Sequence, residues 1–465
     1  MAILGSSMNV PDGVRTDRGP PMAIPFQYFV VALGFLVAGA VGGVLSSLAA
    51  LPGLGSPAYA HLLLVGWICL TIMGAMTQFV PVWSGVEIHS RRLATVQLWL
   101  VAVGLVGLVA SLLALALELL PVFAALMLAG IWLFVYNVGR TLLRARPFDF
   151  TERHFAVALA SFAALAALGF VLALDFALPV LEPVALDRGD VRGAHVTLAV
   201  FGAVTATVVG AIAQLGTMFT QTGTDPLYRG LEGLEQATFP VGLILLALGR
   251  GAGSTTVATV GAVGVLVGLL AVALVLVRRL AASSTDASPM TDRYWIVAAA
   301  LFAWIGLAAP AWLLDPIGPG RVLGYPDATA LLVFGVFGFV VVGTLYHVVP
   351  FIIWIERYSD RVGLEPVPMI DDLYSRRLER ADLAATGLGA AGLVVGEFLG
   401  LATPVVAASA TALGVGFCLF VSNMLLTVHR HDPNGLGYVL RPRLDPTEPT
   451  VAEGADAPEP DRDRS

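Results

Sequence analysis

One apolar stretch recurs three times in the chain and constrains the fold more than any other feature. The copies read AHLLLVGWICLTIMGAMTQFVPVWSG at 60–85, AHVTLAVFGAVTATVVGAIAQLGTMF at 194–219 and ATALLVFGVFGFVVVGTLYHVVPF at 328–351. Alignment of Gly74, Gly210 and Gly343 also aligns the earlier glycines Gly66, Gly202 and Gly335, at intervals of 136 and 133 residues. A long fixed period indicates a repeated structural unit. The sequence therefore predicts one unit present three times, with these segments at its centre.

Composition places the chain in a lipid bilayer. Hydrophobic residues make up 57% and charged residues 13%, with a mean hydropathy of +0.84, whereas globular domains carry about 25% charged residues. The apolar runs are about 20 residues long, which matches the hydrocarbon thickness of a bilayer. They must be helices, because lipid offers the backbone no hydrogen-bond partner. We expect an all-α polytopic membrane protein rather than a soluble enzyme.

Twelve membrane spans are predicted. They lie at about 26–50, 60–83, 93–117, 121–143, 154–178, 193–218, 237–249, 256–278, 293–313, 328–354, 382–402 and 404–428. Alternate assignment of the loops puts 22 of the 26 arginines on one side, leaving Arg188, Arg192, Arg250 and Arg321 on the other. Basic residues favour the cytoplasmic side. The sequence therefore predicts a multi-pass protein of the cell membrane with both termini in the cytoplasm.

The repeat divides the twelve spans into three units of four, at about 25–146, 152–280 and 291–430, with the recurring helix second in each unit. A two-halved transporter would instead repeat after six helices. Residues 1–24 form an N-terminal cytoplasmic segment without the continuous apolar core of a cleaved signal peptide. Residues 431–465 form an acidic tail with too little apolar surface to fold, so disorder is expected. Residues 356–382 are predicted to be a charged connector or a short surface helix.

Three histidines lie within spans and are candidate ligands. His61 and His195 fall in the first turns of their helices, near the external face, and His347 lies near the cytoplasmic end of its span. An ionisable group inside a span usually faces a cavity, a partner or a cofactor, and imidazole binds haem iron and copper. His61 and His195 could hold one cofactor or one each. Alternatively, each bonds a neighbouring carbonyl. The four remaining histidines, His89, His154, His429 and His431, are expected to be solvated at cytoplasmic ends.

Polar residues also mark the inner ends of the repeated helices. Gln78 and Gln214 align with His347, and Tyr346 precedes that histidine. They could form hydrogen bonds that hold neighbouring helices together, or could line a path for protons or water. Four further polar residues lie in or close to spans: Asp175, Glu397, Asn137 and Asn423. No continuous chain of carboxylates crosses the predicted bilayer, so a proton pump is not predicted.

Several other functions find no support in the sequence. Phosphate-binding glycine loops, serine-nucleophile patterns and HExxH are absent. Cys69 and Cys418 lie far apart in sequence within different spans, which excludes a cysteine-based zinc site or a disulfide framework. The arginines are scattered among loops rather than clustered, so nucleic acid is not an expected partner.

The repeated segments resemble the haem-copper oxidase superfamily, that is, cytochrome c oxidase subunit I. The likeness is greatest to its divergent branch, which includes NnrS-type haem and copper membrane proteins of the nitric-oxide response. It rests on HLLLVGWICLTIMGAMTQFVPVWSG, AHVTLAVFGAVTATVVGAIAQLG and FGFVVVGTLYHVVPFIIWIERYSDRVG, and it covers residues 26 to about 430. The resemblance implies haem b, copper or both as cofactors.

The resemblance assigns roles to the span histidines one by one. It implies that His61 occupies the position that binds low-spin haem, and that His195 lies near a copper-ligand position, two residues earlier in the repeat than His61. His347 matches the inner end of the family's tenth helix, which corresponds to the tenth span here. In the family the outer part of that helix binds haem, and this chain has Ala328 and Ala330 there. Helix 7 has no histidine, so the copper triad is incomplete and the high-spin haem ligand is missing. Reduction of oxygen to water is therefore not expected.

Two functions remain open on the sequence. The first is a haem- or copper-binding protein in electron transfer or in handling nitric oxide or oxygen, with a redox partner protein or other membrane subunits. If it is an enzyme, it is a haem-dependent oxidoreductase without the full oxidase ligand set. The second is a cofactor-free transporter or structural subunit on the same fold. The two differ in whether His61 and His195 face one cavity.

Overall fold

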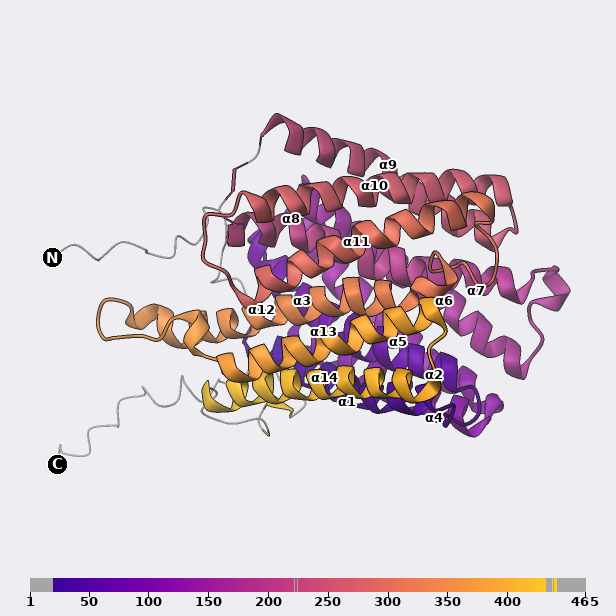
Figure 1. Ribbon diagram of the computed structural model, residues 1–465, viewed down its shortest axis with the longest axis horizontal. Coiled ribbons are helices and arrows are strands. Elements are labelled where there is room, and N and C mark those ends of the chain that lie inside the picture. Colours follow the sequence, from indigo (N-terminus) through magenta and orange to yellow (C-terminus); the bar gives the residue numbers. More distant parts are fainter. Residues whose placement is uncertain (1–19, 221, 224, 432–436, 438, 441–465) are drawn as a thin grey trace, which may run out of the picture.

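The computed structural model describes residues 20–220, 222–223, 225–431, 437 and 439–440. In this part of the chain, twelve helices are long and apolar enough to cross a membrane (Figure 1). The predicted all-α polytopic membrane fold is therefore confirmed. The N-terminal segment predicted at 1–24 lies largely outside the described residues, as does most of the tail predicted at 431–465.

Consecutive spans run in opposite directions through the bundle and are therefore antiparallel (Figure 1). We call the end where the first helix begins and the last one ends the arginine-rich end; it is on the left in Figure 1. Nine spans are single helices: α1 (Ala23–Ser47), α4 (Arg91–Ala114), α5 (Leu120–Leu142), α6 (Phe150–Ala177), α9 (Pro226–Gly251), α10 (Thr255–Ala281), α11 (Pro289–Leu314), α13 (Arg376–Leu399) and α14 (Thr403–His431).

The other three spans are the recurring segments, and each contains a π-helical stretch. The second span consists of α2 (Gly55–His61), η2 (Leu62–Cys69) and α3 (Leu70–Ser84). The sixth consists of α7 (Arg188–Thr197), η6 (Leu198–Thr205) and α8 (Ala206–Thr220), and the tenth of η8 (Leu331–Gly338) and α12 (Phe339–Tyr358). π-Helical turns are rare and are found mostly at functional sites. Their recurrence marks the three spans as equivalent.

The π-helical stretches follow the sequence repeat. Each is eight residues long, and its fifth residue is the first repeat glycine: Gly66, Gly202 and Gly335. The apolar windows of these spans are 83%, 67% and 78% buried, against at most 61% for any other span described. The three recurring helices therefore lie at the centre of the bundle.

The repeat extends to the helix before each recurring segment. A Cβ atom on each second repeat glycine would touch an aromatic Cε1 atom of that helix, at 3.2, 3.3 and 3.5 Å. The pairs are Gly74 with Phe29, Gly210 with Phe155, and Gly343 with Tyr294. The residue before each aromatic also packs on the glycine: Tyr28, His154 and Arg293. Three side chains of different chemistry thus occupy one position of the unit.

Most helices begin a few residues earlier than the sequence predicts, and the seventh and eleventh spans begin earliest relative to their predicted starts. The seventh span, expected from residue 237, begins at Pro226 because Asp225 caps it, with its Oδ1 atom accepting from the Tyr228 amide at 2.7 Å. The eleventh begins at Arg376 behind the cap Ser375. Side-chain caps and an N-terminal proline stabilise polar first turns. The expected 356–382 connector is correspondingly shorter.

Close packing of glycines joins α9 to α10. A Cβ atom on Gly261 would lie 2.1 Å from the backbone nitrogen of Leu246, and one on Gly249 would lie 2.3 Å from that of Ala258. Small residues allow backbones to approach this closely, which is how many membrane helices associate. This pair, the least distinct in the sequence, is therefore a tightly packed hairpin.

Candidate functional site

His61 and His195 make the same kind of hydrogen bond. His61, the last residue of α2, has its Nδ1 atom 2.7 Å from the carbonyl oxygen of Pro57. His195 on α7 has its Nδ1 atom 2.9 Å from the carbonyl oxygen of Leu165 on α6. Carbonyl oxygens only accept, so Nδ1 carries the proton in both rings. The Nε2 atom of each neutral imidazole then keeps its lone pair.

His61 and His195 lie in neighbouring parts of the bundle. Their imidazoles are close enough to interact electrostatically, and the π-helical stretches next to them, η2 and η6, are in contact. Both side chains are half-buried. A histidine that binds a metal usually donates its other ring N–H to a carbonyl or carboxylate, which fixes the tautomer. The pair has this arrangement already, with both Nε2 atoms available.

Two neighbours hold His195 in position. The imidazole lies against Gly169 of α6, where an added Cβ atom would be 2.9 Å from Cε1. Two residues along α7, Thr197 accepts a hydrogen bond of 2.7 Å from the Nη1 atom of Arg250. Arg250 is only 2% exposed and also donates to the carbonyl oxygens of Pro316 and Val322. The sequence analysis placed this arginine in a loop, but it lies in α9 and joins that helix to α7, which carries His195.

His347 lies apart from this pair. It is on α12, toward the arginine-rich end, and its ring stacks on Phe351 with centroids 5.6 Å apart. Within the described residues, no three His, Cys, Asp or Glu side chains are grouped to hold a metal ion. A metal held by His61 and His195 would therefore need any further ligands from outside these four residue types.

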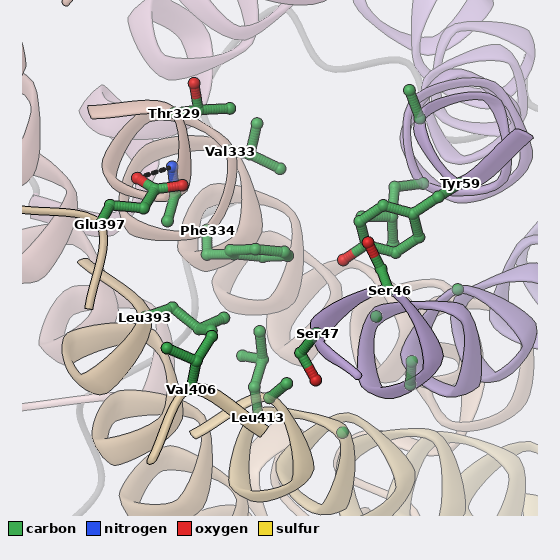
Figure 2. Close-up of a pocket in the computed structure, with 18 of the residues that line it drawn as sticks. Ser46, Ser47, Tyr59, Thr329, Val333, Phe334, Leu393, Glu397, Val406 and Leu413 are labelled. Carbon is green, nitrogen blue, oxygen red and sulfur yellow. Dashed lines mark hydrogen bonds between the residues drawn. The ribbon is translucent and has the colours of Figure 1, made fainter. Parts of the chain in front are cut away.

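A cavity of about 400 Å³ lies between α1, the second span, η8, α13 and α14 (Figure 2). Its walls are mostly apolar, and Tyr59 and Glu397 lie on opposite sides of it. The Oε2 atom of Glu397 accepts a 3.0 Å hydrogen bond from the backbone amide of Ala330. The residues that line the cavity include no histidine, cysteine or methionine. The cavity therefore provides no soft or imidazole ligand, and His61 and His195 are outside its lining.

A polar cluster is buried near the arginine-rich end of the third unit. Arg293, which is fully buried, donates to Glu379 at 2.7 Å and to Asp382. The Tyr346 hydroxyl donates to Asp382 and accepts from Asn423 at 3.0 Å. Four helices, α11 to α14, thus meet through one ion-paired network. Tyr346 makes hydrogen bonds between helices of the kind considered from the sequence.

The first unit has a neutral version of this cluster. The Tyr28 hydroxyl donates to the carbonyl oxygen of Ala94, and Gln97 is fully buried one turn further along α4. Asn137 of α5 lies 3.5 Å from Gln97 and bonds the backbone of Ser90. Gln97 follows the helix cap Ser90 by seven residues, as Asp382 follows Ser375. The first and third units therefore have side chains of different charge at equivalent positions.

In the second unit, His154 occupies the position of Tyr28 in the first unit and of Arg293 in the third. His154 was expected to be solvated, but it is 1% exposed, so that prediction was wrong. Its Nε2 atom lies 2.8 Å from Oε1 of Glu235 on α9, and its Nδ1 atom bonds the carbonyl oxygen of Phe150 at 2.9 Å. The seventh span was predicted to start after Glu235, which left this carboxylate in a loop and hid the pair.

The two glutamines at the inner helix ends make fewer contacts. Gln78 lines a small cavity of about 50 Å³ with Phe351 and Glu356, and its Oε1 atom is buried without a hydrogen-bond partner. Gln214 is half-buried, and its backbone carbonyl oxygen accepts a hydrogen bond from the Thr217 hydroxyl. The structure does not join either glutamine to the paired histidines.

Two sequence signals could have revealed the clusters. The tetrapeptide SRRL occurs at residues 90–93 and again at 375–378, in each case at the start of the third helix of a unit. Asn137 and Asn423 are each followed by a threonine four residues later. These short repeats mark positions that the long apolar repeat does not cover.

Comparison with known proteins adds no family to this description. No protein-family model matches the chain, and no curated protein matches it significantly.

Proposed function

We propose that this integral membrane protein binds a redox metal, as haem b or copper, between His61 and His195. The observation that carries the proposal is the shared hydrogen-bond pattern: each Nδ1 atom donates to a carbonyl oxygen, which leaves each Nε2 atom able to bind a metal. The two rings come from different helices and are close enough to interact. Neither histidine needs the other as a hydrogen-bond partner.

Two imidazole nitrogens suit both forms of the cofactor by ligand type, but neither histidine lines the cavity of about 400 Å³, so the cavity lends no support to a porphyrin between them. Imidazole nitrogen is a common ligand of haem iron and of copper. When bound, such a group supplies one-electron transfer or binds a diatomic gas such as nitric oxide or oxygen. The protein's part is to fix the two rings through Pro57, Leu165 and the packing against Gly169.

A divergent cytochrome oxidase subunit I-like framework is part of the same proposal. Three related units of four helices, with His61 on the second helix, support it. The cavity beside η8 has Ala330 where the resemblance implies a haem ligand. We therefore favour electron transfer or gas handling over reduction of oxygen to water. The excess of arginine at one end supports a cytoplasmic location for that end.

The cavity of about 400 Å³ favours a second candidate function. Its apolar walls and its carboxylate, without a metal-binding histidine, suit a cofactor-free transporter or structural subunit. In that case, the hydrogen bonds of His61 and His195 serve only to join helices.

Absorption spectra of the purified protein, oxidised and dithionite-reduced, test the proposal. We expect a haem or copper spectrum that is lost or shifted in both His61→Ala and His195→Ala and unchanged in His429→Ala. Nitric oxide should then perturb the spectrum of the reduced protein. A folded, colourless and metal-free protein would contradict the proposal and favour the transporter.

A further inference from the structure

The polar cluster of the second unit differs in chemistry from its two counterparts. The equivalent position holds Tyr28 in the first unit, which is neutral, and Arg293 in the third, which is permanently charged and ion-paired. Only the second unit has an imidazole there, paired with a carboxylate. Histidine is the side chain whose charge changes most readily near neutral pH. Of the three side chains at this position, the imidazole is the one of a type that readily gains and loses a proton near neutral pH.

The hydrogen bonds of His154 leave one proton shared between two bases. Its Nδ1 atom must donate to the carbonyl oxygen of Phe150, because that oxygen only accepts. The 2.8 Å contact between Nε2 and Oε1 of Glu235 then holds one proton, on either atom. The pair is neutral overall in both cases. Loss of this proton would leave two lone pairs facing each other beside a buried carboxylate.

Three buried polar atoms around the pair have no hydrogen-bond partner among the described residues. They are Oε2 of Glu235 and the Nε and Nη1 atoms of Arg279 on α10. Both residues are at least 97% buried. The clusters of the other units also have such atoms, among them Nε2 of Gln97 and Oγ1 of Thr95 in the first and Nε of Arg293 and Oγ1 of Thr386 in the third. Buried polar groups without protein partners usually bond internal water.

The charged groups around the pair nearly balance. Arg279 donates to the Tyr228 hydroxyl, which lies within hydrogen-bonding range of Glu232 on the same helix, α9. On α6, Glu152 accepts a 2.6 Å hydrogen bond from the Ser84 hydroxyl. With Arg279 and Glu232 charged, the cluster is neutral when His154 and Glu235 share one proton. A proton gained or lost changes the charge of a buried site.

We propose that His154 and Glu235, with Arg279 and Glu232, form a hydrated proton-binding site at the arginine-rich end. On uptake, a proton from water bonds to Oε2 of Glu235 while the shared proton stays on Nε2 of His154. On release, that proton returns to water, and no other bond changes. The site does not depend on a metal at His61 and His195, which lie toward the other end of the bundle.

Infrared spectroscopy of the purified full-length protein tests this inference. A protonated carboxyl group has a C=O stretch that carboxylates lack and that shifts in D₂O. We expect such a band to rise and fall with pH across the range in which the protein is folded. It should be lost in Glu235→Gln and retained in Glu182→Gln, which removes an exposed carboxylate.

A second variant guards against loss of folding. His154→Gln keeps a hydrogen-bond donor for Glu235 but removes the second base, so the pH at which the band titrates should shift. The proposal is overturned if Glu235→Gln loses no pH-dependent carboxyl band, because His154 and Glu235 then form an ion pair that does not change with pH. It is also overturned if the band titrates identically in His154→Gln.

Discussion

The side chain of Asn423 bonds both backbone polar groups of Ser375. Its Oδ1 atom accepts from the Ser375 amide at 2.9 Å, and its Nδ2 atom donates to the Ser375 carbonyl oxygen at 3.0 Å. Asn137 bonds Ser90 in the same way, at 2.9 Å for both contacts. In both units the last helix therefore fixes the start of the third helix. The same contact between an asparagine and a helix-capping serine therefore occurs in the first and third units.

Loss of this contact should destabilise the bundle. Asn423→Ala leaves the Ser375 amide and carbonyl without that partner, and an unsatisfied buried polar group costs about 1–3 kcal/mol. We expect a lower free energy of unfolding by about that amount, measured in detergent with increasing SDS. Ser422→Ala, at the exposed neighbouring position, is the control. Equal stability of the two variants would show that the contact adds nothing.

Removal of Arg293 should cost more. Arg293→Met leaves Glu379 and Asp382 as unpaired buried carboxylates, and breaking a buried ion pair in this way costs about 3–5 kcal/mol. Adding Glu379→Gln and Asp382→Asn should restore much of the stability, because no buried charge is then left over. Thermal unfolding of the single and triple variants measures both effects. A triple variant as unstable as Arg293→Met would argue against this explanation.

Two glycines on α13 provide a matched test of helix packing. A Cβ atom on Gly389 would lie 2.2 Å from the backbone nitrogen of Leu413 on α14, whereas one on Gly387 would meet nothing within 4 Å. Gly389→Ala should destabilise the protein by about 1–3 kcal/mol, because a methyl group is forced against backbone. Gly387→Ala should be neutral or stabilising by up to about 1 kcal/mol, since alanine favours helix. The same unfolding assay separates them.

Arg250 should influence the histidine pair through α7. Lysine cannot reproduce the several hydrogen bonds that the guanidinium makes to Thr197, Pro316 and Val322. Arg250→Lys should therefore lower stability by about 1–3 kcal/mol and reduce bound metal. Arg192→Lys, at an exposed position on α7, should change neither. Metal content and unfolding are measured on the same preparations. Full metal occupancy in Arg250→Lys would show that Arg250 does not position the histidine pair.

The sequence was sufficient for the helical architecture because apolar length is a property of continuous segments. All twelve spans were predicted, whereas the π-helical stretches around Gly66, Gly202 and Gly335 were not. The errors fell at polar helix starts. The first turns of α9 look like a loop by hydropathy, and it is the cap at Asp225 that makes them helical.

The candidate site was only partly predictable. His61 and His195 could be selected because ionisable residues are rare in spans, but their carbonyl partners Pro57 and Leu165 depend on helix rotation and packing. The pair of His154 with Glu235 joins residues 81 positions apart, and no local pattern connects them. Arg250 looked like a loop residue because burial of a charge is decided by the surrounding carbonyl groups.

X-ray absorption of the purified protein at the iron and copper edges tests the central claim most directly. The edge identifies the metal, and the fine structure reports the atoms bound to it. We predict two imidazole nitrogens as protein ligands in the wild type, with the metal or one imidazole lost in His61→Ala and in His195→Ala. A protein without iron or copper, or a metal whose ligands are unchanged in both variants, would contradict the claim.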